Sequence, residues 1–372
     1  MAVTRTQVLR YRVHAQQLDR ATRKDRRPDA AAVLDLGVQD TGPDGALWAL
    51  ALRGVPVSAH TWPKELALAW SVRASPHAYR RADLPAVQRA LRPYSEADAA
   101  KRVLSASQPL KAAGIPALDA LATVARTMHD LVAEPMVKGT LSTRLTTRMT
   151  EPYLRWCPAC HATHVYEMPF RLGALHGGLE LEPDTSPPVV RRIPRWPAGQ
   201  VGNLERPTDD DDGPVDLLRN LLHLLGPMTP AQAATYLDGA VRDVKARWPQ
   251  DAVEVTVDGR PASMLDGDLP ALQDPPDQPV VRLLGPYDLY LQGRDRDLLV
   301  PDTARHKALW PVLGRPGAVL VDGEVVGTWR PRAKGKVLAL ELDPWVPWSA
   351  ATTTAVGVEH ERLAQFRGLT PA

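Results

Sequence analysis

Two cysteines and two histidines lie within eight residues of one another in the sequence Cys157-Pro-Ala-Cys160-His161-Ala-Thr-His164. Thiolate and imidazole are the ligands that structural zinc sites use most often. Four ligands so close in sequence are difficult to wrap around one tetrahedral ion. A zinc site would therefore use Cys157, Cys160 and one histidine, His164, together with a remote residue. The alternative is two reduced, partly buried thiols. We expect no cofactor to be required beyond such a structural zinc ion.

A second group of polar residues follows an apolar segment near the N-terminus, in the sequence Gly37-Val-Gln39-Asp40-Thr41-Gly42. This concentration of an amide, a carboxylate and a hydroxyl is unusual for a loop between helices. Asp and Thr can cap the helix that follows, because their oxygens accept hydrogen bonds from backbone N–H groups. Spacing alone therefore favours a capping role.

Motifs of three common enzyme classes are absent from the sequence. It contains no glycine-rich phosphate-binding loop, no G-x-S-x-G sequence and no H-E-x-x-H pair. Nucleotide hydrolysis, serine hydrolysis and zinc proteolysis therefore lack their usual signatures.

The composition of the 372-residue chain is near the globular average, with 44% hydrophobic and 24% charged residues. This balance excludes wholesale disorder. The formal net charge of +2 neither requires nor excludes a polyanionic partner. No apolar run approaches the roughly 18 to 20 residues that span a bilayer, and the N-terminus lacks the apolar core of a secretory signal. We therefore expect a cytoplasmic protein that does not bind membranes.

The polar loop, residues Gly37–Gly42, lies in a region of predicted helices. Apolar spacing predicts helices over residues 4–20, 29–36, 46–52, 63–70, 83–91, 117–132 and 140–149. Gly37 stands where the second of these helices would need a C-cap. A proline-rich stretch and the acidic run Asp209–Asp212 then indicate a linker or an exposed loop.

Residues 215–265 have the pattern of a winged helix. Helices are predicted over residues 215–225, 231–237 and 239–248. An alternating segment then leads into the turn Asp258-Gly259, which is typical of a β-hairpin. In a winged helix the third helix can enter the major groove of DNA, which makes Arg242 and Lys245 candidate DNA-binding residues. The alternative is an ordinary helix-hairpin fragment. Beyond it, alternating segments predict an antiparallel sheet.

Four sequence blocks resemble those of the winged-helix DNA glycosylases of the AlkZ/YcaQ type. The blocks are GVQDTGPDGALWALALR, WSVRASPHAYRRADL, LLGPYDLYLQGRDRDLLVPD and VDGEVVGTWRPR, and the resemblance extends over roughly residues 5–345. In that family the first block has the form (Gln/His)-hydrophobic-(Gln/Asp/Thr). Gln39 matches the first position, Thr41 matches a divergent branch of the third, and Asp40 stands where the family has a hydrophobic residue.

The resemblance implies an α+β fold of tandem winged-helix modules followed by a C-terminal antiparallel β-rich domain. The expected segments are residues 1–100 (first module, with the polar loop), 101–195 (second module, with the cysteines), 196–213 (acidic, proline-rich linker), 214–282 (third module), 283–350 (β domain) and 351–372 (C-terminal tail).

The resemblance also implies a monofunctional DNA glycosylase that excises N-alkylated purines in alkylation or crosslink repair. It would act as a monomer on double-stranded DNA, with Gln39, Asp40 and Thr41 as the catalytic residues. The DNA-binding residues expected from the blocks and from the third helix are Arg53, Arg73, His77, Arg242, Lys245 and Arg296. The alternative is a winged-helix DNA-binding protein without catalysis, either a transcriptional regulator or an inactive repair paralogue.

Overall fold

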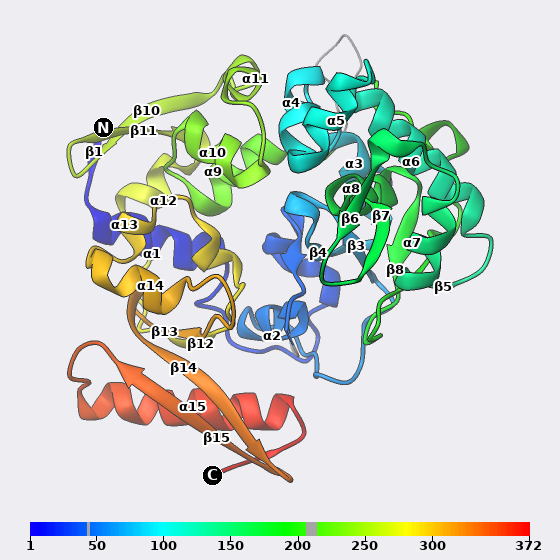
Figure 1. Cartoon of the computed structure of the whole chain (residues 1–372). Coiled ribbons are helices and arrows are strands. Elements are labelled where there is room, and N and C mark those ends of the chain that lie inside the picture. The colour runs from blue at the N-terminus through cyan, green and yellow to red at the C-terminus, as the bar shows by residue number, and fades with distance from the viewer. Residues whose placement is uncertain (43–44, 206–213) are drawn as a thin grey trace. The chain divides into compact units, whose positions relative to one another are not determined.

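The computed structural model describes residues 1–42, 45–205 and 214–372, and these form two units (Figure 1). The first unit consists of Met1–Glu65, Leu218–Ala233 and Trp248–Ala372. The second consists of Leu66–Leu217 and Ala234–Arg247. Each unit is discontinuous in sequence, so the units differ from the six consecutive segments expected. The acidic run Asp209–Asp212 lies outside the described residues.

Helix α1 (Arg5–Ala15) opens the first unit with a capping box. Thr4 Oγ1 accepts a hydrogen bond from the Gln7 backbone N–H, and Gln7 Oε1 accepts one from the Thr4 backbone N–H. These bonds satisfy backbone donors that the first helical turn leaves without partners. The helix ends five residues earlier than predicted, before Gln17, whose φ is +61°.

The segment before the polar loop is not the predicted α-helix. Residues Pro28–Ala30 and Ala32–Asp35 form two 3₁₀ turns, closed by i→i+3 hydrogen bonds such as Leu36 N–H to Val33 O. Gly37 then reverses the chain with a φ of +78°. The segment is too short and too sharply turned for α-helical i→i+4 bonds. Strand β2 (Val38–Gln39) and helix α2 (Gly45–Leu52) follow.

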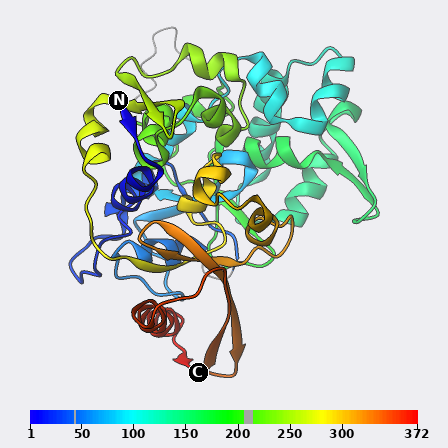
Figure 2. The same ribbon diagram turned by 90° about the vertical axis from the view of Figure 1, so that its left-hand side faces the viewer.

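The C-terminal part of the first unit is a five-stranded sheet, which confirms the predicted antiparallel β-rich domain. Its strands run in the order β12 (Val281–Leu284), β13 (Gly317–Val321), β14 (Glu324–Lys334), β15 (Val337–Pro344) and β16 (Thr370–Pro371). All neighbours are antiparallel except β15 and β16. The segment expected to be a tail is helix α15 (Ala350–Phe366), which buries Val356, Leu363 and Phe366. Figure 2 shows α15 nearly end-on beside the β14–β15 hairpin.

Residues 217–265 contain three helices followed by a hairpin, in the predicted order. The elements are α9 (Leu217–Leu225), α10 (Pro230–Leu237), α11 (Val241–Ala246), β10 (Ala252–Val257) and β11 (Arg260–Leu265). Asp258 and Gly259 form the hairpin turn with φ values of +44° and +80°, as a type I′ turn requires. Met228 forms an antiparallel bridge to Ser263 in the hairpin. The fold is therefore α+β, with winged-helix elements and a C-terminal β domain.

The second unit combines helices with an antiparallel sheet. Its strands run in the order β4 (Pro76–Arg80), β3 (Leu66–Trp70), β8 (Leu179–Leu181), β9 (Val189–Arg192) and β5 (Met136–Val137). Its helices include α3 (Leu84–Ala90), α4 (Glu96–Arg102), α6 (Ala117–Leu131), α7 (Lys138–Thr146) and α8 (Glu167–His176).

The predicted helix over residues 63–70 is wrong, because Leu66–Trp70 is strand β3. All five side chains of this strand are buried. Strands β4 and β8 pair with it on either side, so it lies inside the sheet. Short apolar runs of this kind do not distinguish a buried strand from a buried helix.

The described residues contain no helix that is both long enough and apolar enough to span a lipid bilayer.

One ion pair is completely buried in the first unit. Arg53, directly after α2, donates hydrogen bonds from Nη1 and Nη2 to the two carboxylate oxygens of Asp288, each 2.8 Å long. Both side chains are inaccessible to solvent. Arg53 also donates to the Ala49 carbonyl oxygen, and Asp288 accepts from the Tyr290 backbone N–H. These bonds offset the cost of removing both charges from water.

We expect Asp288→Ala to lower the free energy of unfolding by about 3 to 5 kcal/mol, because it leaves the Arg53 guanidinium buried without a counter-charge. Urea denaturation followed by tryptophan fluorescence measures the loss. The double variant Arg53→Met/Asp288→Leu removes both charges and should recover more than half of that loss. A double variant no more stable than Asp288→Ala would show that the pair itself is not the cause.

Candidate active site

A cavity of about 390 Å³ lies in the first unit, and the side chains of Gln39 and Thr41 line it. Its other walls come from α2, from the loop that follows β12, from the segment before β13 and from β14. This volume is within the range of small-molecule pockets. The cavity therefore has room for a nucleobase or a deoxyribose at the polar loop.

Two tryptophans give the cavity rigid aromatic walls. Trp48 Nε1 donates a hydrogen bond of 2.8 Å to the Leu283 carbonyl oxygen, and Trp329 Nε1 donates one of 2.9 Å to the Leu284 carbonyl oxygen. A Cβ on Gly317 would lie only 2.2 Å from Trp329 Nε1. Glycine is therefore required for the Trp329 ring to keep its position.

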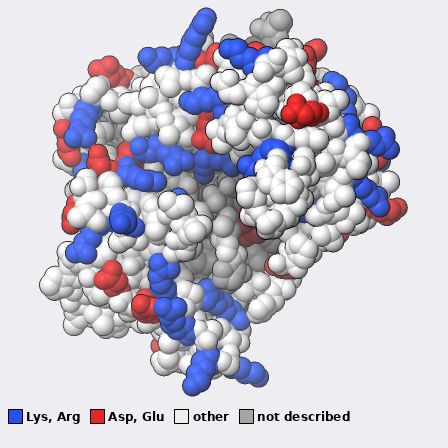
Figure 3. Space-filling view, in the orientation of Figure 1, with Lys and Arg blue, Asp and Glu red and all other residues white. Residues whose placement is uncertain are grey.

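Four arginines add positive charge to the cavity walls, and one of them, Arg332, is paired with Glu341 on β15. They are Arg315, Arg330, Arg332 and Arg367. The Arg315 guanidinium lies over the Tyr287 ring, 5.1 Å from its centroid. Figure 3 shows further basic side chains along the β14–β15 hairpin, which carries Lys334 and leads into Lys336. Guanidinium groups bind phosphate through both charge and paired hydrogen bonds, so these walls suit a nucleic-acid backbone.

Gln39 and Thr41 contact each other within the cavity. Gln39 Nε2 donates a hydrogen bond of 3.0 Å to Thr41 Oγ1. Both side chains are half-buried. The amide and the hydroxyl are thus held together, with access to the cavity.

Asp40 has a different environment. Its Oδ1 accepts a hydrogen bond of 2.9 Å from the Ala46 backbone N–H in the first turn of α2. A Cβ on Gly45 would lie 2.3 Å from that oxygen and 2.8 Å from the Asp40 Cα. The carboxylate thus accepts a hydrogen bond from the start of α2, as expected if Asp40 caps this helix.

The six residues expected to bind DNA have very different exposures. Arg53 is fully buried in its ion pair with Asp288, so no part of it is accessible to DNA. Arg73 is half-buried, and its Nη1 donates to the Tyr236 carbonyl oxygen. Arg296 is half-buried over the Trp310 ring. Only Arg242 and Lys245, on α11, are exposed.

His77 is also inaccessible, with 1% of its surface exposed. Burial and the nearby positive charge of Arg73 lower the pKa of His77 to about 3. Its Nδ1 lies 2.9 Å from the Ser75 carbonyl oxygen and 3.0 Å from Ser71 Oγ. The imidazole is thus a neutral core group of the second unit and offers no charge to a phosphate.

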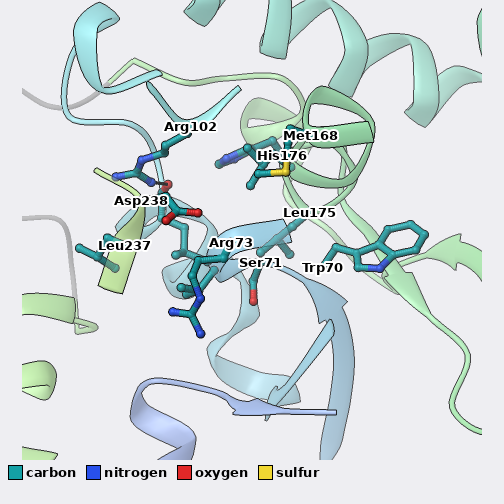
Figure 4. Close-up of a pocket in the computed structure, with 12 residues that line it drawn as sticks. Trp70, Ser71, Arg73, Arg102, Met168, Leu175, His176, Leu237 and Asp238 are labelled. Carbon is teal, nitrogen blue, oxygen red and sulfur yellow. Dashed lines mark hydrogen bonds between the residues drawn. The ribbon is translucent and has the colours of Figure 1, made fainter. Parts of the chain in front are cut away.

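A pocket in the second unit is too small for a substrate. It measures about 20 Å³, and Ser71, Arg73, Arg102, His176 and Asp238 are among the residues around it (Figure 4). That volume holds about one water molecule. The larger cavity of the first unit is therefore the better candidate site.

The predicted zinc ligands gather at the hairpin of β6 (Leu154–Cys157) and β7 (Ala162–Val165). Each of the residues Cys157, Cys160 and His164 offers one ligand atom, and these three atoms lie within 4.8 Å of one another. Hydrogen bonds from His164 and from the Cys160 backbone lower the pKa of the Cys157 thiol to about 6. A hydrogen bond to the Cys157 sulfur and the negative charge of the Cys157 thiolate raise the pKa of Cys160.

The cavity arginines and both tryptophans were not among the site residues expected from the sequence. Trp329, Arg330 and Arg332 belong to the block VDGEVVGTWRPR, which lies in the region predicted to form an antiparallel sheet. Alternation along a strand indicates which residues share a face, but it does not indicate what that face encloses.

The fold and the cavity define a class of protein. Three helices followed by a hairpin are the elements of a winged-helix DNA-binding protein, and the arginine-lined cavity is suited to a nucleic acid. The sequence model of one family, described as "DNA glycosylase AlkZ-like", matches residues 33–366. This chain belongs to the AlkZ-like DNA glycosylase family. Its class is therefore that of DNA-binding DNA glycosylases, which act in DNA repair.

A solved structure has the same fold. The chain is similar to the Streptomyces sahachiroi DNA glycosylase AlkZ, with a TM-score of 0.71 and 19% sequence identity over 100% of both chains. No curated protein matches the sequence. At this identity the likeness establishes the fold.

We expect Asp40→Ala to lower the free energy of unfolding by about 1 kcal/mol, because the Ala46 N–H loses its acceptor. Asp40→Asn is the control, since its amide oxygen can accept the same hydrogen bond. Chemical denaturation measures both. Equal losses in the two variants would assign the stabilisation to the negative charge at the helix N-terminus instead of to the hydrogen bond.

The unfolding free energy should decrease as the pH falls from 6.5 towards 3. In this window the unfolded chain protonates His77, whereas the folded protein keeps it neutral, which gives a slope of up to about 1.4 kcal/mol per pH unit. Denaturation at pH 7, 6 and 5 measures the slope. His77→Gln should have a smaller slope than the wild type, and the exposed control variant His161→Gln should not. Identical slopes in all three proteins would refute the buried neutral state.

Proposed function

We propose that this chain is a monofunctional DNA glycosylase that hydrolyses the N-glycosidic bond of N-alkylated purines in double-stranded DNA. The observation that carries the proposal is the hydrogen-bonded pair Gln39–Thr41 inside a cavity whose walls bear four arginines. We further propose that the protein acts as a monomer, in the cytoplasm, without a cofactor in the reaction.

The chemistry that this site must supply is modest. Alkylation at N7 or N3 places a positive charge on the purine, which makes the base a good leaving group. The bond then breaks with an oxocarbenium-like sugar as the transition state. A positioned water and polar groups near the sugar are sufficient, and no lysine nucleophile is needed.

Gln39 and Thr41 are suited to hold that water. The bond from Gln39 Nε2 to Thr41 Oγ1 leaves the Gln39 amide oxygen to accept a hydrogen bond from water and the Thr41 hydroxyl hydrogen to donate one. The water adds to C1′ of the sugar as the base departs with the electron pair of the C1′–N9 bond, and it loses a proton to solvent water to yield the abasic product. In this proposal the two side chains orient the nucleophile.

We propose that Asp40 has a structural role and positions Gln39 and Thr41. Its bond to the Ala46 N–H holds the loop against α2 and so places the residues on either side of it. The alternative is that its carboxylate stabilises the cationic sugar or accepts the proton. Asp40→Asn distinguishes these roles, because loss of the negative charge would slow base release by orders of magnitude only in the second case.

We expect Gln39→Ala to abolish release of N7-alkylguanine while leaving the free energy of unfolding and the affinity for duplex DNA nearly unchanged. An interaction used mainly in the transition state is lost from the rate and not from ground-state binding. The measurement is abasic-site formation in a duplex with one alkylated guanine. Gln365→Ala, an exposed glutamine on α15, is the matched control and should retain full activity.

The competing function is DNA binding without catalysis. DNA affinity alone does not separate the two, because both predict duplex binding that weakens as salt is added. Wild-type protein that binds duplex DNA but releases no N7- or N3-alkylated purine would favour the non-catalytic function. Full activity in Gln39→Ala would instead move catalysis to another site.

A further inference from the structure

We propose that Cys157, Cys160 and His164 bind one zinc ion at the turn of the β6–β7 hairpin. Their ligand atoms lie within 4.8 Å of one another. In a tetrahedral site with Zn–S and Zn–N distances of about 2.3 and 2.0 Å, ligand atoms are about 3.4 to 3.8 Å apart. Movements of about 1 Å in side chains near the hairpin surface would therefore complete the coordination.

The strand register places two of the ligands on the same face. Arg155 pairs with His164, and Cys157 pairs with Ala162. Since alternate residues of a strand share a face, Cys157 and His164 are diagonal neighbours on one side of the hairpin. A shift of one residue would move His164 to the opposite face. The pairing therefore specifies the ligand cluster.

The turn between the strands carries the second cysteine. Cys157 is the last residue of β6, and Cys160 lies in the turn that leads to β7. His161, with a φ of +47°, then turns the chain into β7 and brings His164 back beside Cys157.

A zinc ion at this position would stabilise the β6–β7 hairpin. Strands β6 and β7 form a two-stranded sheet separate from the other sheets of the described residues. A two-stranded sheet is marginally stable in water by itself, and here β7 packs on α7. A metal ion between the turn and the second strand would add a further link at the end of the hairpin. A disulfide across so short a loop would remove little chain entropy and would leave the position of His164 unexplained.

Three protein ligands leave the fourth position to water. Within the described residues the cluster contains no fourth histidine, cysteine or carboxylate, and the neighbouring His161 is not part of it. Cys160 is exposed, so the fourth position is open to solvent. His161→Ala is therefore the matched control for His164→Ala.

The experiment measures metal in tag-free protein purified under reducing conditions without added zinc. Elemental analysis after dialysis should find one zinc ion per chain. Replacement by Co²⁺ should give the intense charge-transfer absorption of thiolate coordination. Cys160→Ser and His164→Ala should each weaken zinc binding by more than the ~100-fold that loss of an outer hydrogen-bonding partner can cause. His161→Ala should bind zinc like the wild type.

A chelator should lower the melting temperature of the wild type and leave that of Cys160→Ser unchanged, which detects the ion independently of activity. The proposal is overturned if wild-type protein retains no zinc after zinc is supplied and the excess removed. It is also overturned if Cys160→Ser retains zinc, or if mass spectrometry finds Cys157 and Cys160 joined as a disulfide in metal-free native protein. Loss of zinc in His161→Ala would overturn the three-residue ligand set.

Discussion

The buried pair of Arg53 and Asp288 is the interaction on which the candidate site depends. Arg53 ends the α2 region, whose first turn supports the polar loop, and Asp288 ends the loop after β12 that forms another cavity wall. The pair thus joins two walls that are 235 residues apart in sequence. Because either charge alone would be costly to bury, the two segments are held together as a unit.

Within the polar loop, Asp40 contacts helix α2, whereas Gln39 and Thr41 line the cavity. Gln39 lies at the end of strand β2, where successive side chains point to opposite sides. Gln39 and Thr41 therefore reach the cavity together, while Asp40, between them, turns towards α2 and accepts a hydrogen bond from it. The middle residue of this loop can therefore be a carboxylate that supports α2 and does not line the cavity.

The positive charge at the cavity walls, more than the net charge of the chain, suits this protein to bind DNA. The formal charge is only +2, yet the cavity walls bear four arginines. Other arginines are occupied within the core, such as Arg12, which pairs with Asp295, and Arg53. Counting basic residues in the sequence cannot separate these two groups, since burial decides which of them a phosphate can reach.

The sequence by itself determined local elements, namely the order of three helices and the Asp258-Gly259 hairpin and the polar residues of the loop, because backbone geometry and nearest neighbours dictate them. It also determined the family, through Gln39 and the other blocks. Only the tertiary structure decided that Leu66–Trp70 is a strand, that Arg53 and His77 are buried, and that Trp329 and Arg332 line the cavity of Gln39. Those outcomes depend on contacts between distant segments, which periodicity does not encode.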